Sequence, residues 1–287
     1  MNNDFSDLSN GWKALCSKLL RAVLLGLFCL GGISTAQAGR ACGEWQPTPT
    51  DVRNGLSLAH KVRTALDASG AELAIIARAG QDLSKYGLNY SHAAFVVRAR
   101  SSVPEKTWLN VHLLNQCGTA KAELFHEGLG NFFLDDMFRY EALVLIPPPA
   151  LQAALLAQLS DASGAGAMPA MRFFEPHYNM LAYTYATKYQ NSNQWVLETL
   201  AAAMAGPSVQ GRAQAQAWLK TAGFAPITLQ ISTLTRLGGR VTRANIAFDD
   251  HPNERRFANK IDTVTVDALV NFLQQREPAS KRLEIKL

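Results

Sequence analysis

Apolar positions recur along the chain with two periodicities, one typical of helices and one typical of strands. Helical spacing predicts helices over residues 51–68, 149–159, 193–205, 213–221 and 267–275. Asp51 is placed to cap the first of these helices, and Gly206 with Pro207 ends the third. Short apolar runs predict strands over residues 71–79, 92–100, 108–114, 141–146, 226–233 and 261–266.

The order of these elements indicates the fold class. The strands up to residue 146 follow one another closely, with a short helix predicted within residues 128–139, which favours a meander. Most of the predicted helices come later, and no internal repeat or low-complexity linker divides the sequence. We therefore predict one α+β domain in which an antiparallel sheet packs against helices.

The N-terminal segment has the layout of a secretory signal. Three basic residues between positions 13 and 21 precede an apolar run from residue 22 to 30, and the small-residue site Ala36-Gln37-Ala38 follows. The run is shorter than the ~20 residues that a permanent membrane helix needs. We predict a signal peptide over residues 1–38, cleavage after Ala38 and a periplasmic location. The alternative is an uncleaved anchor.

The remaining residues, 39–287, are expected to form a single soluble domain. They carry 25 lysines and arginines against 21 acidic residues, a net charge of +4 without any block of like charge. Such a mild excess does not indicate a nucleic-acid partner. No later segment is apolar for long enough to cross a bilayer, so we expect no stable membrane span after cleavage.

Two cysteines remain after the predicted cleavage, Cys42 and Cys117. In an oxidising compartment they predict one disulfide, which the loop-closure model values at roughly 4 kcal/mol. The alternative is a catalytic thiol at Cys117. That residue follows a predicted strand and does not open a helix, so the sequence shows no cause for a lowered thiol pKa.

Two short segments combine polar residues with apolar neighbours that could hold them rigidly. In Tyr90-Ser91-His92 the imidazole opens a predicted strand, and in Asn191-Ser192 a hydroxyl stands at the start of a predicted helix. Either Asn191 or Ser192 could serve simply as the helix N-cap. A helix N-terminus also offers unpaired N–H groups that stabilise an anionic nucleophile or an oxyanion.

A strand that opens with Tyr-Ser-His, followed about a hundred residues later by a helix that opens with a nucleophile, resembles the circularly permuted NlpC/P60 papain-like proteins. In that group a cysteine opens the helix, whereas this chain has Ser192. The resemblance implies a papain-like fold in which Ser192 attacks a carbonyl, His92 acts as general base and His112 orients the imidazole. Asn115 is the second candidate for that orienting role.

Longer strings resemble a bacterial family known as domain of unknown function 2145, which lends no activity. These strings include Gly128-Leu129-Gly130-Asn131-Phe132-Phe133, Gln190-Asn191-Ser192-Asn193-Gln194-Trp195 and Asn245-x-Ala247-Phe248-Asp249-Asp250-His251-Pro252. Together they cover nearly all of residues 42 to 275.

We predict a cleft around His92 and Ser192 that recognises an acyl or amide group of a cell-envelope component, either a peptidoglycan peptide or a lipid. The residues predicted to bind the ligand are Tyr90, Asn191, Asn193, Gln194, Asp249, Asp250 and His251. A serine hydroxyl needs a well-placed base throughout its attack, so hydrolysis and non-catalytic binding both stay open. A third alternative is an envelope-assembly protein without cleft chemistry.

Neither a cofactor nor a metal is predicted. The histidines lack the close i, i+4 pairing and the CxxC companions of a strong zinc site. The charged segment Asp249-Asp250-His251 is followed by Pro252 and two arginines, so an ion-pair cluster that fixes a loop is the alternative to ligand binding there.

Overall fold

The computed structural model describes residues 46–99, 107–135, 137–160 and 168–287, all of which belong to one compact unit, Gln37–Leu287. The predicted signal peptide and Cys42 lie outside these residues, so the signal and the Cys42–Cys117 disulfide stay predictions. Within the described ranges, no helix combines the length and the apolar character that a membrane span requires.

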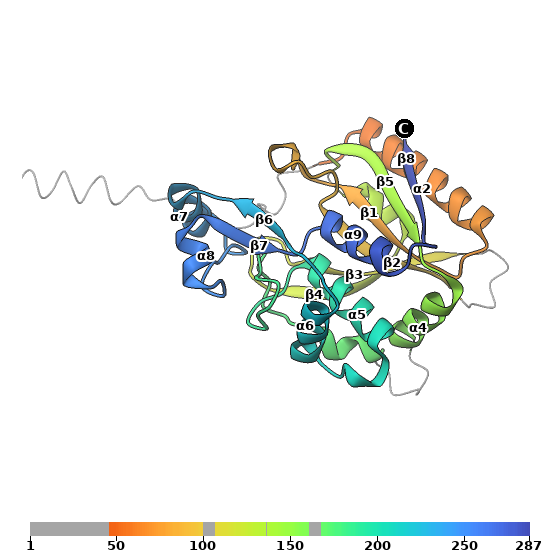
Figure 1. Ribbon diagram of the computed structural model, residues 1–287. Helices are drawn as coiled ribbons and strands as arrows, with labels where there is room; N and C mark the ends of the chain where they lie inside the picture. Colours follow the sequence, from red (N-terminus) through yellow and green to blue (C-terminus); the bar gives the residue numbers. More distant parts are fainter. Residues whose placement is uncertain (1–45, 100–106, 136, 161–167) are drawn as a thin grey trace, which may run out of the picture. The chain divides into compact units, whose positions relative to one another are not determined.

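A six-stranded sheet with the strand order β4-β3-β2-β1-β5-β8 forms the centre of the fold, and all neighbouring strands run antiparallel (Figure 1). The strands are β1 (Leu73–Ala79), β2 (His92–Arg98), β3 (Trp108–Asn115), β4 (Ala122–Gly128), β5 (Arg139–Ile146) and β8 (Lys281–Lys286). The α+β class with an antiparallel sheet packed on helices is thus confirmed, whereas the papain-like permutation is not.

Helices cover both faces of this sheet. One face packs against α2 (Pro49–Ser69) and α3 (Leu129–Leu134). The other packs against α4 (Pro149–Leu159), α5 (Ser192–Ala205), α6 (Arg212–Thr221) and α9 (Val266–Arg276). Because side chains alternate along a strand, Ala94 and Val96 of β2 face α2 and α3, while Ala93 and Phe95 face α5. The central strands are therefore buried on both sides.

A second, two-stranded sheet pairs β6 (Ile227–Gln230) with β7 (Lys260–Thr263), and α7 (Thr233–Thr242) and α8 (Asn253–Phe257) lie between these strands in the chain. This part has a small apolar core of its own, built from Leu88, Leu229, Ile231, Phe248 and Ile261. Three short 3-10 helices complete the described chain: η1 (Ser84–Tyr86), η2 (Pro169–Phe173) and η3 (Gly206–Ser208).

Helix capping differs in one respect from the sequence prediction. The N-cap of α2 is Thr48, whose hydroxyl accepts the backbone N–H of Asp51 at 3.2 Å. Asp51 instead accepts the backbone N–H of Thr48 at 2.9 Å, so the two residues form a reciprocal capping box. In α5 the cap is Asn191, which accepts the backbone N–H of Gln194 at 2.8 Å.

Candidate functional site

His92 and His112, two of the three residues predicted to be catalytic, lie against each other on the sheet face that α3 covers. His92 Nε2 is 2.8 Å from His112 Nδ1, and His112 Nε2 is 2.9 Å from Glu127 Oε1. Both imidazole rings also pack against Phe132 of α3. The structure therefore contains the His92–His112 contact expected of a base and its orienting partner, although their catalytic role stays a prediction.

The environment of these two imidazoles favours their neutral forms. Burial lowers the pKa of His92 well below its usual 6.5, and the positive charge of Arg78 acts in the same direction. Burial also lowers the pKa of His112, although the hydrogen bond and the charge of Glu127 oppose this shift. At neutral pH the two buried imidazoles are uncharged, and they are hydrogen-bonded in a row that ends at the partly exposed Glu127.

Ser192, the third residue predicted to be catalytic, lies on the opposite side of the sheet from the two histidines. It begins α5, which covers the other face of the sheet, and its hydroxyl is 3.4 Å from the hydroxyl of Tyr178. Both Ser192 and His92 lie within the described ranges, and no hydrogen bond joins their side chains. His92 has the orientation of Ala94, away from α5, because it is two residues from Ala94 in the same strand. The predicted Ser192–His92 pair is therefore not formed.

The residues around Ser192 connect the N-terminus of α5 to the strands beside it. Asn193 accepts the backbone N–H of Ala93 at 2.9 Å and donates to the carbonyl of Ser91 at 3.3 Å. The paired register of β2 with β3 stops at Phe95, so the amide of Asn193 hydrogen-bonds β2 beyond the end of that ladder. Asn193 thus has a positioning role in the fold.

Asn191 and Gln194 have similar structural tasks. The amide of Asn191 donates to Thr263 Oγ1 at 3.0 Å, besides capping the helix. Gln194 donates to the carbonyl of Thr184 at 3.2 Å. These contacts connect α5 to β7 and to the loop before the helix, so the structure gives both residues fold-stabilising partners and does not test their predicted ligand contacts.

One turn further along α5, Glu198 is fully buried in a polar cluster. Its carboxylate accepts hydrogen bonds from Arg212 at 2.8 Å, Gln190 at 2.7 Å and Gln216 at 2.7 Å. Burial raises the pKa of Glu198, whereas these donors and the charge of Arg212 oppose the shift. The polar string that begins at Gln190 is therefore largely explained by buried structural hydrogen bonds.

Asp249, Asp250 and His251 also make contacts that hold loops together. Asp249 accepts from Lys188 at 2.5 Å, and Asp250 accepts the backbone N–H of Tyr183 at 2.7 Å. His251 Nδ1 lies 2.9 Å from Asp250 Oδ1. This is the arrangement of an ion-pair cluster that fixes a loop, the alternative to ligand binding at this segment.

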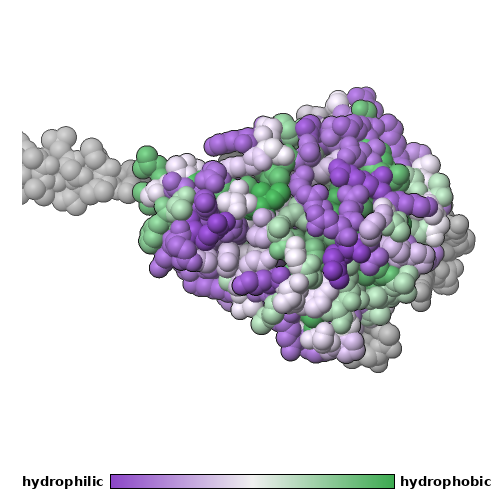
Figure 2. Space-filling view, viewed as in Figure 1, coloured by the Kyte–Doolittle hydropathy of each residue, from purple (hydrophilic) through white to green (hydrophobic). Residues whose placement is uncertain are grey.

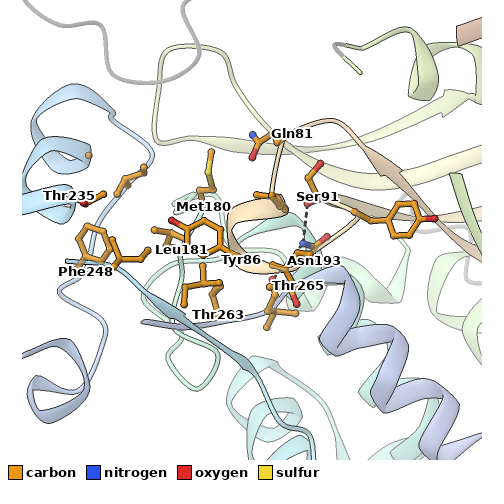
Figure 3. Close-up of a pocket in the computed structure, with 18 residues that line it drawn as sticks. Gln81, Tyr86, Ser91, Met180, Leu181, Asn193, Thr235, Phe248, Thr263 and Thr265 are labelled. Atoms are coloured by element: carbon orange, nitrogen blue, oxygen red, sulfur yellow. Dashed lines mark hydrogen bonds between the residues drawn. The ribbon is translucent and has the colours of Figure 1, made fainter. Parts of the chain in front are cut away.

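The structure contains an apolar pocket that the sequence did not predict as a whole. Its volume is about 250 Å³, and it lies between the loop around η1, the start of α5, the β6–β7 sheet and α7. Figure 3 shows Met180, Leu181 and Tyr86 grouped between Thr235 on α7 and Asn193 at the start of α5. Other apolar residues of its wall are Leu83, Leu229, Ile231, Phe248 and Val264.

Several polar residues of the pocket wall are engaged in hydrogen bonds within the protein. Thr263 Oγ1 donates to the carbonyl of Ala182 at 3.0 Å, and Thr265 Oγ1 caps α9 by accepting the N–H of Ala268 at 3.1 Å. Among the described residues, none that lines the pocket has a buried polar side-chain atom without a partner. The wall therefore offers mainly apolar contact to a ligand.

Two residues predicted to bind the ligand, Tyr90 and Asn193, do line this pocket. Partial burial raises the pKa of Tyr90 to about 12, so its hydroxyl stays protonated at neutral pH. The apolar wall residues were missed because they come from five segments that are distant in sequence. In the described ranges, no group of three or more His, Cys, Asp or Glu side chains is arranged to hold a metal ion.

Comparison with known proteins identifies a protein family for this chain but no individual relative. No curated protein and no solved structure matches the chain. These comparisons show no relationship to the NlpC/P60 proteins. Residues 65–273 match the model of a bacterial family, and this match covers well over half of the chain. The chain therefore belongs to the family described as "Uncharacterized protein conserved in bacteria (DUF2145)".

Proposed function

We propose that this protein is an exported binding protein that holds an acyl chain of a cell-envelope lipid in the apolar pocket beside α5. The observation that carries the proposal is the pocket itself, whose wall is mainly apolar and whose threonines at 263 and 265 are hydrogen-bonded within the protein. A ligand that enters it gains by removing apolar surface from water and is offered few polar contacts.

The size of the pocket narrows the ligand class. A volume of 250 Å³ has room for roughly eight groups of the size of a water molecule. This is less than the usual volume of a site for a whole small molecule. A short acyl chain, or the end of a longer one, fits these dimensions. A peptidoglycan peptide would bring amide groups that find few polar partners in this mainly apolar wall.

Binding without cleavage agrees best with the surroundings of Ser192. Its hydroxyl contacts the hydroxyl of Tyr178, and burial raises the pKa of that phenol. A protonated phenol is not a general base for serine, and the imidazole of His92 is directed to α3. The periplasmic location is part of the proposal and rests on the signal features of residues 1–38.

Two neighbouring glycines of α7 allow a matched test of the pocket. Gly239 lines the pocket, and a Cβ atom there would lie 3.5 Å from the side chain of Ile246, an ordinary contact. At Gly238 a Cβ would meet nothing within 4 Å. The Gly239→Leu and Gly238→Leu proteins therefore carry the same added group on the same helix, one directed at the pocket and the other at open space.

Isothermal titration with decanoate measures the effect. We expect the wild-type and Gly238→Leu proteins to bind it, and Gly239→Leu to bind about tenfold more weakly or worse. The reason is that leucine adds four carbon atoms to a space for roughly eight water-sized groups. Equal affinities of the two variants, or absence of binding to the wild-type protein, would contradict the proposed function.

A further inference from the structure

The most exposed large apolar side chains of the described residues are concentrated in one short stretch. Leu234, Leu237 and Val241 of α7 are 81%, 60% and 66% exposed, and Phe257 of α8 is 71% exposed. Every other large apolar side chain in the described ranges is less than half exposed. Figure 2 shows hydrophobic residues at the surface on the side of the view where Figure 1 places α7.

The three side chains on α7 form one stripe that points away from the protein. They are spaced i, i+3 and i+7, which places them on one face of a helix. The inward face is occupied by Thr235 and Gly239, which line the pocket. The stripe is thus the outer side of the same helix whose inner side forms part of the pocket wall.

The inward face of α7 is firmly attached, so the exposed stripe does not result from a loosely packed helix. Arg236 is buried and donates to the carbonyl of Ile231 at 2.8 Å and to Asn259 Oδ1 at 2.9 Å. Asn259 follows α8 by two residues, so this contact also connects α7 to the end of the helix that carries Phe257.

Basic residues accompany the apolar stripe. Arg240 is 57% exposed on α7, with Asp249 at 4.0 Å, and Arg243 directly follows the helix and is exposed. Residues 227–263, from the start of β6 to the end of β7, contain six lysines and arginines against four acidic residues, so this region carries a small positive charge. An amphipathic helix with an apolar stripe flanked by arginines is the pattern of a helix that lies in the interface of an anionic bilayer.

We propose that α7, together with Phe257, docks on the surface of a bilayer that contains anionic phospholipid, with its leucines in the acyl region and its arginines at the headgroups. Docking by α7 and Phe257 does not depend on the pocket, but its use in delivering an acyl chain to the pocket rests on the proposed function. The pocket lies directly behind the docked helix.

A second copy of this chain fits the stripe less well. A two-fold contact places the same patch of both subunits together, so it would gather four arginines, Arg240 and Arg243 of each copy, at one interface. Like charges that approach in this way oppose association. Anionic headgroups would instead pair with the two arginines, at about 1 kcal/mol for each basic residue near the surface.

Vesicle flotation with the protein starting at residue 39 tests the docking. Wild-type protein is expected to float with vesicles of phosphatidylcholine and phosphatidylglycerol, and much less with phosphatidylcholine alone. The Leu234→Ser/Leu237→Ser protein should partition about tenfold less, because it loses two apolar side chains from the bilayer contact. Leu56→Ser, which changes a leucine that is 48% exposed on α2, is the matched control and should float like wild type.

Two further variants separate the apolar and the charged contributions. Arg240→Gln/Arg243→Gln should weaken binding to the anionic vesicles by about fivefold for each arginine and should leave the weak binding to neutral vesicles unchanged. Gly238→Leu extends the stripe, since residue 238 is one turn from Leu234, and should strengthen binding. A gain in binding by a variant whose urea midpoint equals that of the wild type cannot arise from misfolding, so this variant keeps the test valid if others fold poorly.

Three results would overturn the docking proposal: no flotation of the wild-type protein, flotation equal for all variants, or a dimer that Leu234→Ser/Leu237→Ser dissociates while vesicles are not bound. Titration with decanoate in the absence of vesicles reports on the pocket independently. Vesicle binding without decanoate binding would reject the proposed function and support the docking surface. Decanoate binding without vesicle binding would support the proposed function and reject the docking surface.

Discussion

Helices α5 and α7 border the same pocket but distribute their polar and apolar residues in opposite ways. The first eleven residues of α5 are buried, and many of its polar side chains, such as Asn193 and Glu198, are hydrogen-bonded inside the protein. In α7 the arginine at position 236 is buried, and the leucines at 234 and 237 face outwards. The polar residues at the start of α5, which the sequence made candidates for a site, therefore have a structural explanation. The apolar stripe on α7, which the sequence prediction did not include, is the better candidate for a surface that binds a bilayer.

The largest effect is expected where α5 carries its buried charge. Glu198→Ala leaves Arg212 buried without a counter-charge, so we expect the free energy of unfolding to fall by about 3 to 5 kcal/mol in urea denaturation. Glu254→Ala, at an exposed glutamate of α8, is the control and should change stability by less than about 0.5 kcal/mol. Similar small losses for both variants would show that the α5 cluster is not structural.

The next effect concerns two buried asparagines with different surroundings. Asn193→Ala removes the partner of the Ala93 backbone N–H, and we expect a loss of about 1 to 3 kcal/mol in the free energy of unfolding. Asn110 is also buried, but its amide atoms have no partner in the described part of the chain. Asn110→Ala should therefore cost clearly less than Asn193→Ala. The opposite order would contradict the positioning role of Asn193.

A smaller, pH-dependent effect comes from the histidines on the other sheet face. The pKa of His92 and that of His112 are lowered in the folded protein below the usual 6.5. The unfolded chain therefore binds these protons first, and stability is lost as the pH falls below about 6.5. Between pH 6.5 and 5 the loss amounts to up to about 2 kcal/mol for each histidine.

Urea unfolding of the wild-type and His92→Gln proteins at several pH values between 7.5 and 5 measures this contribution. The slope of stability against pH should be shallower in the variant, because one buried imidazole no longer takes up a proton on unfolding. An unchanged slope would mean that His92 is accessible to protons in the folded protein.

The smallest effect on stability is expected for the exposed stripe of α7. Leu234→Ser/Leu237→Ser removes side chains that make little contact in the folded protein, so the free energy of unfolding should change by less than about 0.5 kcal/mol for each. Leu200→Ser in α5, at a fully buried position, should lower it by more than about 2 kcal/mol. A large loss in the α7 variant would show that its leucines pack inside the protein.

The sequence predicted the central elements well because their apolar patterns are strong. The predicted helix over 149–159 agrees with α4, and the predicted strands over 71–79 and 108–114 agree with β1 and β3 to within two residues. Helix α7 was missed because its leucines, although spaced for a helix, are interrupted by two glycines. Strand β8 was missed because it lies at the sheet edge and is largely charged.

The candidate site was harder to predict than the fold. Strand β2 is buried on both faces and apolar at consecutive positions, so its sequence does not reveal which face His92 joins. A shift of one residue would have turned the imidazole towards α5. The pocket could not be derived because its wall joins segments from Gln81 to Thr265 that are far apart in the sequence. What the sequence did identify was Tyr90 and Asn193, both of which line the pocket.

Affinity as a function of chain length tests the central claim, the acyl-binding pocket, most directly. Titration calorimetry with linear carboxylates of four to fourteen carbons should show affinity rising about fourfold with each methylene, since each buried methylene contributes about 0.8 kcal/mol. The rise should level off near roughly eight buried carbons, where 250 Å³ is filled. Affinity that is independent of chain length, or no binding at any length, would contradict the account.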